Sequence, residues 1–560
     1  MIAIDHSTPA ARRRLAVRAL AGFAAVAFLV GLIMGATTVS GTERTARSFA
    51  AAWERGDYPA MYSLLTPAAR ERVTPESFKN AYVTAAATAT AIGVQALKVH
   101  GDGRIESEVR TRIFGTLRGD VRLPVVDDRI DWKPHLVFPG LSEGVPLTRR
   151  TTVPLRAKIL SREGRTIVSG PATAREVVPT SPAASIAGSL AVPTDQASQM
   201  AAYARGFPLG SPVGTSGLER ALEPQVAGRP GGELLAGGRR LAASRPVAAR
   251  PVRSSIDLQV QAAAVGALAG RFGGIAALEP GTGRVRALAG IAFSAPQPPG
   301  STFKIITATA GLEERLVKPK TPFPVETHAV IDGVDLENAN GEACGGTFVE
   351  TFAHSCNSVF APLGVKLGAQ RLVAAAEKFG FNETPSIVGA AMSTLPPAEE
   401  IDSPLAVGST AIGQGKVLAT PLEMAVVADT IASGGVRHRP TLLERGPRAA
   451  GVRVTTRRVA RLVERMMIDV VRYGTGTAAS LAPVPVAGKT GTAELQSTQG
   501  EPPPGEESAP AESDTDAWFA AYAPTRRPRL SVGVLFVKAG AGGTTAAPAA
   551  RIVLAAGLKR

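Results

Sequence analysis

The 560-residue chain is poor in cysteine and in aromatic side chains, with two cysteines and 5% Phe, Trp and Tyr together. With so few thiols and no histidine pair near them, a metal site is not expected. No predicted helix or sheet face interleaves arginine with aromatic rings, as base stacking requires. Nucleic-acid binding is therefore disfavoured, although the formal net charge is +15 and the pI is near 10.2. An anionic membrane or cell-wall polymer fits this charge better.

Long uncharged runs are also scarce, and the one that reaches a membrane-spanning length covers residues 19–36. It is preceded by Arg12, Arg13, Arg14 and Arg18. A basic flank before an apolar core is typical of a secretory signal or of a single membrane anchor with its N-terminus inside. We expect a cytoplasmic tail at 1–18, an uncleaved anchor at 19–38 and an extracytoplasmic remainder, with cleavage near Ala36 as the alternative.

Three soluble regions are predicted after the anchor. Helical spacing over 43–91, followed by alternating strands, indicates a small α+β domain over 43–134. Residues 135–250 are irregular and rich in Pro, Ser and Ala, which predicts an extended pedestal or dimerisation-type linker domain. Residues 251–560 read as an α/β domain, in which a helical insert separates the early and late strands of an antiparallel sheet. Its predicted strands lie near 274–278, 285–288, 484–489, 517–523 and 530–537.

Two local features accompany this last region. Cys344 and Cys356 are close in sequence, so in an exported protein they are a candidate disulfide, with two buried thiols as the alternative. Closing so short a loop contributes about 3 kcal/mol in the chain-entropy model. Residues 496–516 form an acidic, proline-rich insert between two predicted strands, which we interpret as a solvated loop.

Ser301 and Lys304 are the first candidate site residues. They follow Pro298-Pro299-Gly300 and precede an apolar helical run. Residues three apart share one helix face, so the lysine amine can reach the serine hydroxyl. An adjacent amine that accepts the proton turns a hydroxyl into a nucleophile. The pair by itself is a weak signal, because it arises by chance in many chains.

Two further motifs follow in order, Ser355-Cys356-Asn357 and Lys489-Thr490-Gly491-Thr492. The ordered set S-x-x-K, S-x-N and K-T-G is shared by penicillin-binding proteins and β-lactamases. On these three motifs the chain resembles a penicillin-binding protein.

The resemblance covers about residues 251–560 with specific motifs. Residues 408–415 and 518–524 are similar to family segments before the last helices and after K-T-G. More loosely, residues 132–139 look like the pedestal region of class B members. Residues 43–134 resemble the nuclear-transport-factor-like domain of the methicillin-resistance subgroup. The usual Arg-Gly-x-Ile segment is here Arg156-Ala157-Lys158-Ile159, and the acidic motifs of the class A glycosyltransferase are not found.

The resemblance implies a role for each motif residue. Ser301 would be the nucleophile, Lys304 its base and Ser355 a proton relay. The remaining residues would bind and orient the substrate. Asn357 would hold the lysine and a substrate amide, and Lys489 would supply a positive field near Ser355. Thr490 and Thr492 would offer hydroxyls to a substrate carboxylate, and Gly491 would let a peptide lie close to the strand. The backbone N–H groups of Ser301 and Thr492 would form the oxyanion hole.

By resemblance, the function is that of a class B peptidoglycan D,D-transpeptidase that acts on D-Ala-D-Ala stem peptides and is acylated by β-lactams. No cofactor and no metal are implied. Expected partners are the membrane, a glycosyltransferase and other cell-wall synthesis proteins. The alternatives are a D,D-carboxypeptidase, a β-lactam-hydrolysing or low-affinity resistance protein, and a division or elongation scaffold with secondary catalysis. The sequence leaves open the acceptor amine and the choice among septal, side-wall and resistance roles.

Overall fold

The computed structural model describes residues 39–446, 449–494 and 515–559, which fall into two compact units. The first unit contains the described residues up to Pro154 together with Thr194–Ser211 and Arg229–Val247. The second contains Leu155–Pro193, Pro212–Gly228 and the described residues from Ala248 onward. Segments from 135–250, predicted from sequence as one linker domain, therefore contribute to both units.

Two sequence predictions concern segments that the structure does not describe. The predicted anchor at 19–38 lies outside the described residues, as does the acidic segment 496–516 apart from Thr515 and Asp516. Within the three described ranges, no helix has the length and apolar character needed to cross a bilayer.

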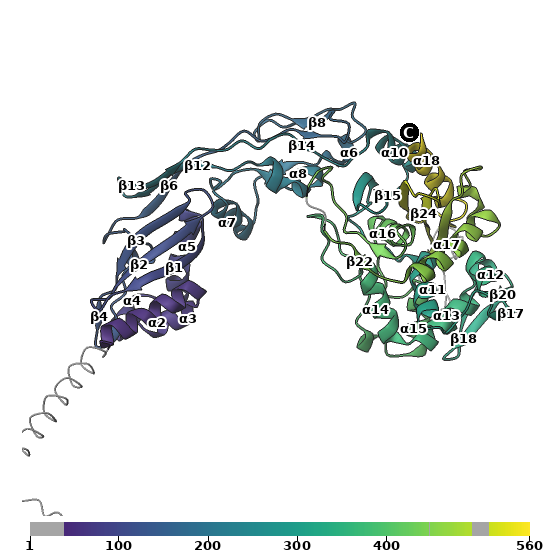
Figure 1. Cartoon of the computed structure of the whole chain (residues 1–560), viewed down its shortest axis with the longest axis horizontal. Coiled ribbons are helices and arrows are strands. Elements are labelled where there is room, and N and C mark those ends of the chain that lie inside the picture. Colours follow the sequence, from purple (N-terminus) through teal and green to yellow (C-terminus); the bar gives the residue numbers. More distant parts are fainter. Residues whose placement is uncertain (1–38, 447–448, 495–514, 560) are drawn as a thin grey trace, which may run out of the picture. The chain divides into compact units, whose positions relative to one another are not determined.

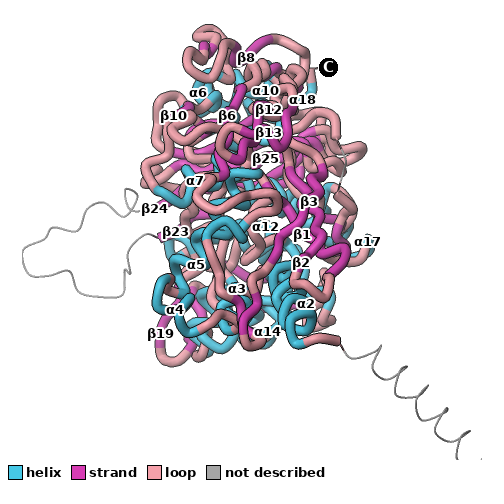
Figure 2. Tube along the Cα trace, turned by 90° about the vertical axis from the view of Figure 1, so that its left-hand side faces the viewer, coloured by secondary structure: helices cyan, strands magenta, loops and turns pink. Residues whose placement is uncertain are grey.

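The first unit begins with helices and continues into an antiparallel sheet (Figure 2). The side chains of Ser40, Asp57, Thr66 and Thr74 cap the four helices at their N-termini. The core beneath them is aromatic, with Phe78 packed edge-on against Trp132. The elements are α2 (Gly41–Arg55), α3 (Tyr58–Ser63), α4 (Pro67–Arg72), α5 (Pro75–Ala89), β1 (Ala91–Val99), β2 (Arg104–Thr111) and β3 (Thr116–Arg122), with sheet order β1-β2-β3.

A second sheet of the first unit is assembled from distant parts of the chain. Strand β6 pairs antiparallel with β12, and β12 with β13. The bounds are β6 (Leu147–Thr152), β12 (Gly231–Ala236) and β13 (Arg239–Ser244), and the unit also holds β4 (Val125–Val126), β5 (Arg129–Ile130), the 3-10 turn η1 (Pro134–Val137) and α7 (Gln196–Ala204).

The second unit starts with a small sheet in which β14 pairs parallel with β7. Short helices pack beside it, and one apolar cluster joins them to the main domain through Leu218, Leu278 and Leu422. The elements are β7 (Ile159–Leu160), β8 (Thr166–Ser169), β9 (Glu176–Val177), α6 (Ala184–Ala187), β10 (Leu190–Ala191), β11 (Val213–Gly214), α8 (Gly217–Ala221), α9 (Glu223–Val226) and β14 (Val252–Arg253).

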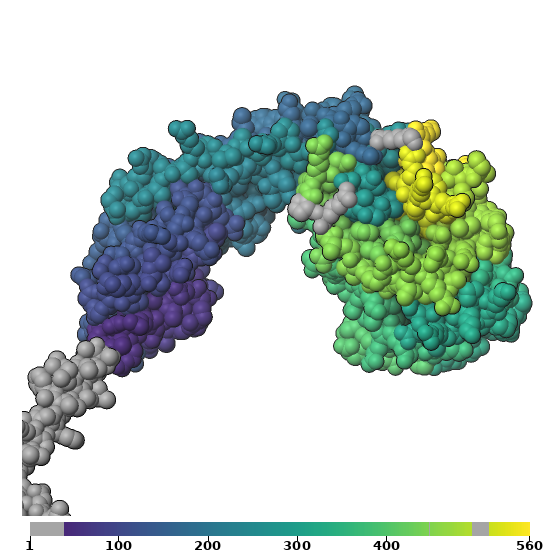
Figure 3. Space-filling view, in the orientation of Figure 1, coloured from purple at the N-terminus to yellow at the C-terminus, as the bar shows by residue number. Residues whose placement is uncertain are grey.

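A five-stranded antiparallel sheet organises the rest of the second unit, in the order β16-β15-β25-β24-β23. Two of its strands, β15 and β24, are labelled in Figure 1. Along β24 the side chains alternate: Phe519 packs in the cluster that contains α10 and α18, and Trp518 and Tyr522 pack in the helical cluster on the other face. The bounds are α10 (Leu258–Leu268), β15 (Gly273–Glu279), β16 (Arg284–Gly290), β23 (Ala487–Glu494), β24 (Thr515–Ala523), β25 (Leu530–Phe536) and α18 (Ala546–Leu558). Helix α18 also reaches the molecular surface, where it is yellow in Figure 3.

The predicted helical insert lies between β16 and β23, together with small hairpins. It comprises η2 (Gly300–Phe303), α11 (Lys304–Glu313), β17 (Pro322–Glu326), β18 (His328–Ile331), β19 (Val334–Glu337), η3 (Ala339–Gly341), β20 (Cys344–Thr347), α12 (Phe348–Ala353), α13 (Asn357–Leu367), α14 (Ala369–Phe379), η4 (Ala398–Glu400), α15 (Pro404–Ala411), α16 (Pro421–Ala432), β21 (Val436–Arg437), β22 (Val452–Arg453), α17 (Arg457–Arg472) and η5 (Thr477–Ala479). This insert and strand β23 carry the three motifs.

Candidate active site

Ser301 lies on the one-turn 3-10 helix η2, and Lys304 is the first residue of α11. The backbone N–H of Gly300 donates to Gly413 O at 2.9 Å, and the hydroxyl of Thr307 donates to Ala411 O at 2.6 Å. The segment 408–415, which the sequence marks as family-like, is thus the support behind the nucleophile turn.

Two glycines allow η2 to lie against strand β23. A Cβ atom at Gly491 would lie 2.7 Å from Pro299 O, and one at Gly300 would lie 2.7 Å from Thr492 O. Gly300 also has φ of +51°, in the left-handed region that favours glycine. Gly491 was predicted to admit a peptide, but its α-carbon faces the turn that carries Ser301. In this structure the glycine keeps the first and third motifs in contact.

Ser355 occupies the tight turn between α12 and α13. The N–H of Cys356 donates to Thr351 O and that of Ser355 to Phe352 O, which is the Schellman pattern at a helix C-terminus. Ser355 has φ of +64° at the position where glycine is usual. A left-handed serine costs backbone energy, so the surrounding contacts must hold it there.

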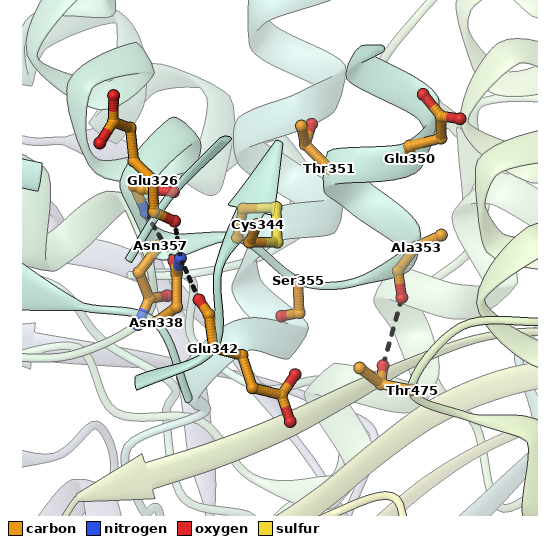
Figure 4. Close-up of a disulfide and its surroundings, with 12 residues drawn as sticks. Glu326, Asn338, Glu342, Cys344, Glu350, Thr351, Ala353, Ser355, Asn357 and Thr475 are labelled. Carbon is orange, nitrogen blue, oxygen red and sulfur yellow. Dashed lines mark hydrogen bonds between the residues drawn. A yellow bond between two sulfur atoms is a disulfide. The ribbon is translucent and has the colours of Figure 1, made fainter. Parts of the chain in front are cut away.

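A disulfide joins the residue after Ser355 to strand β20. Cys344 and Cys356 are bonded, with their Cα atoms 5.5 Å apart, and both are buried (Figure 4). Because β20 directly precedes α12, the bond closes a loop that contains α12 and Ser355. It restrains the turn in which Ser355 adopts its left-handed conformation.

The three motifs meet at the hydroxyl of Ser355. Lys489 Nζ donates to Ser355 Oγ at 2.8 Å, and Lys304 Nζ lies 3.4 Å from the same oxygen. Lys304 Nζ also donates to Ser355 O at 2.7 Å and to Asn357 Oδ1 at 2.6 Å. Among the hydrogen bonds of the described residues, none joins Ser301 Oγ to Lys304 Nζ. The lysine is instead held by the second motif, one helical turn from the nucleophile.

Asn357 connects the lysine to a neighbouring hairpin. Its oxygen accepts from Lys304, and its amide nitrogen donates to Glu337 O at 2.6 Å. The amide oxygen of Asn357 thus contacts the lysine, and one of its two N–H donors, which were expected to hold a substrate amide, is bound to β19. Asn338 continues this anchoring, because its Oδ1 accepts the N–H of Ser358 at 2.9 Å and its Nδ2 donates to Glu326 O and Glu342 O (Figure 4).

Both lysines are fully buried, and burial shifts their protonation. Burial, followed by the charge of Lys489, lowers the pKa of Lys304 well below its ordinary value. Burial lowers the pKa of Lys489 to about 7. Among the described residues no carboxylate pairs with either amine. A neutral amine near the serine is what general-base catalysis at neutral pH requires.

The third motif lies on the edge strand β23, which pairs with β24 alone in its sheet. Thr490 and Thr492 follow Lys489 along this edge. Thr490 Oγ1 lies 2.5 Å from Thr475 Oγ1, and the N–H of Gly542 lies 3.5 Å from Thr492 Oγ1. An edge strand leaves alternate backbone groups unpaired, so an extended peptide can pair there.

Thr475 is a site residue that the sequence reasoning missed. Its hydroxyl contacts Thr490, its N–H donates to Ala353 O at 3.1 Å, and Figure 4 shows it facing Ala353. It thereby links the end of α12 to β23. The sequence feature that could have indicated Thr475 is the small-residue segment 474–477, which follows the amphipathic helix α17.

Comparisons with known proteins point to one family. The penicillin binding protein transpeptidase domain family matches residues 273–555. The peptidoglycan D,D-transpeptidase PbpA of Mycolicibacterium smegmatis is 32% identical over 417 residues, which cover 62% of this chain and 80% of that protein. The PbpA of Mycobacterium tuberculosis strain H37Rv is 35% identical over 298 residues, 48% of this chain and 56% of that protein.

Solved structures show the same fold. The crystal structure of PBPA from Mycobacterium tuberculosis has a TM-score of 0.58 at 26% identity and covers 72% of this chain and 100% of that chain. The penicillin G acyl-enzyme complex of that protein has a TM-score of 0.57, at the same identity and coverage. With the family match spanning half of its length, the present chain belongs to the penicillin-binding protein transpeptidases, in their class B branch.

Proposed function

We propose that the chain is a serine-type peptidoglycan D,D-transpeptidase in which Ser301 forms the acyl-enzyme. The observation that carries this proposal is the convergence of two lysines on Ser355 Oγ: Lys489, and Lys304, which lies one helical turn after Ser301. The PbpA relatives, which are peptidoglycan D,D-transpeptidases by name, support the same reaction.

In the first half-reaction, Ser301 Oγ attacks the carbonyl carbon of the penultimate D-Ala. The hydroxyl proton passes to Lys304 Nζ, which the lowered pKa leaves available as a base. The C–N bond then breaks, and the departing D-Ala amine takes a proton through Ser355 Oγ. Ser355 suits this relay because its hydroxyl contacts both amines.

The developing oxyanion is bound by the backbone N–H groups of Ser301 and Thr492. Thr492 O lies beside Gly300, and the N–H and C=O of one residue point to the same side of an antiparallel strand. The N–H of Thr492 therefore points away from β24, toward the nucleophile turn. A donor of this kind contributes about 3 kcal/mol to transition-state stabilisation.

In the second half-reaction an amine of a neighbouring stem attacks the acyl carbon and gives a proton to Lys304 Nζ. The bond between that carbon and Ser301 Oγ then breaks, and Ser301 Oγ takes up the proton. Among the described residues, no Asp or Glu side chain hydrogen-bonds to Ser301, Lys304 or Ser355. No carboxylate is therefore held directly against these three side chains in the described part of the site, which supports transfer to an amine over β-lactam hydrolysis.

The rest of the chain takes the class B organisation in this proposal. The apolar run 19–38 anchors the protein with its catalytic unit outside the cell, and the helices and sheet of residues 43–134 form a nuclear-transport-factor-like domain. Residues 135–250 supply the pedestal. A glycosyltransferase that polymerises the glycan strands is the expected partner, because cross-linking requires newly made strands.

Intact-mass analysis of the full-length protein with penicillin G tests the acyl-enzyme. We expect one penicillin G adduct per chain, located on Ser301, and none in Ser301→Ala. A matched control is Ser358→Ala on α13, which should retain the adduct. An adduct elsewhere, or no adduct on the folded wild type, contradicts the proposal.

Transfer is tested separately with a stem peptide that ends in D-Ala-D-Ala and a second stem as amine acceptor. Formation of a cross-linked dimer with loss of one D-Ala supports a transpeptidase. Exclusive trimming of the donor identifies a carboxypeptidase instead.

A further inference from the structure

Each buried lysine of the site lies over the ring of a phenylalanine. Lys304 Nζ is 5.4 Å from the ring centroid of Phe360, and Lys489 Nζ is 5.6 Å from that of Phe352. Both distances are within the range of cation–π attraction, which is about 6 Å. The two rings flank the Ser355 turn, Phe352 on α12 before it and Phe360 on α13 after it.

The rings form one packed cluster. Phe352 meets Phe360 edge-on with centroids 5.9 Å apart, and Phe348 stacks on Phe360 at 5.4 Å. All three side chains are fully buried. Helices α12 and α13 therefore present aromatic faces to the two amines and the motif serine between them.

A buried ammonium without a counter-charge is costly, because it loses its hydration and gains no carboxylate. The described residues provide Lys304 and Lys489 with no acidic partner. The face of an aromatic ring carries negative charge density and attracts a cation, most strongly where water is excluded. Phe352 and Phe360 are thus placed to offset part of the burial cost.

We infer that Phe352 and Phe360 are positioning residues that stabilise the ammonium forms of Lys489 and Lys304 through their ring faces. The inference rests on the proposed function. In the acylation step the proton leaves Ser301 Oγ and binds the lone pair of Lys304 Nζ, so the ammonium arises over Phe360. The ring forms no bond and takes no proton. Phe352 favours the charged form of Lys489 in the same way.

The titratable groups of neighbouring elements do not replace the rings in stabilising the two ammonium groups. The amines of Lys304 and Lys489 lie on either side of Ser355, and the charge of Lys489 lowers the pKa of Lys304. On α17, which packs beside both α11 and β23, Glu464 accepts the hydroxyl of Tyr522 at 2.8 Å. On β24, Asp516 accepts the N–H of Lys538. These carboxylates have their own partners and do not pair with the lysines.

The test replaces Phe360 or Phe352 in the full-length protein with mono-, di- and trifluorophenylalanine. Fluorine weakens the ring quadrupole stepwise and nearly preserves ring shape. The readout is the rate of Ser301 acylation by penicillin G as a function of pH. Phe381, which is buried against Phe303 and lies over no lysine in the described structure, receives the same series as a matched control.

The two series should move different limbs of the pH profile. Weakening the Phe360 face makes the Lys304 ammonium less stable, so the acid limb shifts to lower pH by about 0.5 to 1 unit over the series. The maximal rate falls about threefold, because a weaker base accepts the proton less readily. The Phe352 series shifts the alkaline limb, which reports Lys489, to lower pH by a similar amount.

The inference is overturned if the limbs of the pH profile do not move in the Phe360 and Phe352 series. It is also overturned if the Phe381 series gives shifts of equal size. The monofluoro variants, which differ by a single atom, keep the test decisive if heavier fluorination lowers stability. A wild type without any Ser301 adduct contradicts the proposed function instead. A Ser301 adduct with flat fluorination series contradicts only the role of the rings.

Discussion

Arg156 and Lys304 are both buried basic side chains of the second unit, but they have opposite surroundings. Arg156 donates to Glu219 Oε2 at 2.5 Å and to Glu223 Oε2 at 2.6 Å, and all three side chains are almost fully buried. Arg175 adds a second cation, donating to Glu219 Oε1 at 2.7 Å. Lys304 has neutral oxygen acceptors and a second lysine across Ser355.

This difference separates a structural use of buried charge from a catalytic one. Paired charges keep one another ionised and hold the chain in place. Unpaired amines lose their protons more easily, so they serve as acids and bases near neutral pH. Burial without a carboxylate partner in the described site is therefore what makes Lys304 reactive.

The largest expected effect comes from removing the reactive amine. Lys304→Met should slow penicillin G acylation of Ser301 by about 10³-fold, because the base is lost. The apparent unfolding temperature should stay equal or rise, since no buried carboxylate is left unpaired. Stopped-flow acylation and thermal unfolding measure the two effects. Lys366→Met, at an exposed position of α13, is the control and should change neither quantity.

Removing the paired cation should give the opposite pattern. Arg156→Met leaves Glu219 and Glu223 buried without this partner, so we expect a loss of about 3 to 5 kcal/mol in the stability of the second unit. Acylation per folded molecule should be unchanged. Urea unfolding of the full-length protein gives the stability. In contrast, Arg371→Met breaks an exposed pair with Glu314 and should cost less than about 1 kcal/mol.

Equal stability losses in Arg156→Met and Arg371→Met would remove the basis of the comparison. A large stability loss in Lys304→Met would do the same, because it would give the amine a structural role.

A smaller effect is expected from changing Ser355, whose backbone has the left-handed conformation. Ser355→Gly removes the relay hydroxyl and relieves the backbone, so the protein should gain about 1 kcal/mol of stability while acylation slows by about 10²-fold. Ser355→Ala loses the same hydroxyl but keeps the Cβ atom. A gain of the same size in the alanine variant would show that the backbone conformation of Ser355 is not strained.

The sequence predicted the motif residues and the sheet, because both follow local patterns. Strand β23 was expected near 484–489 and spans Ala487–Glu494, and β24 and β25 overlap the ranges expected for them, 517–523 and 530–537. The three motifs were identified by their order. That Ser355 Oγ would be their meeting point depends on contacts between residues far apart in the chain, which periodicity does not encode.

Other features had no local signal. A positive φ at Ser355 is unexpected for a residue with a Cβ atom. The packing role of Gly491 depends on the distant Pro299 carbonyl, so the glycine suggested substrate approach instead. The division of 135–250 between two units depends on β6 pairing with β12, strands that are far apart in sequence. Such pairings are decided by tertiary contacts and not by composition.

The pH dependence of Ser301 acylation in the wild-type protein tests the central claim most directly. The rate of penicillin G adduct formation, followed by intact mass, should rise as Lys304 loses its proton on the acid side. It should fall above about pH 7, where Lys489 loses its charge, because burial lowers the pKa of that lysine to about 7. A rate that climbs continuously to pH 10, as ordinary lysines would give, contradicts the account.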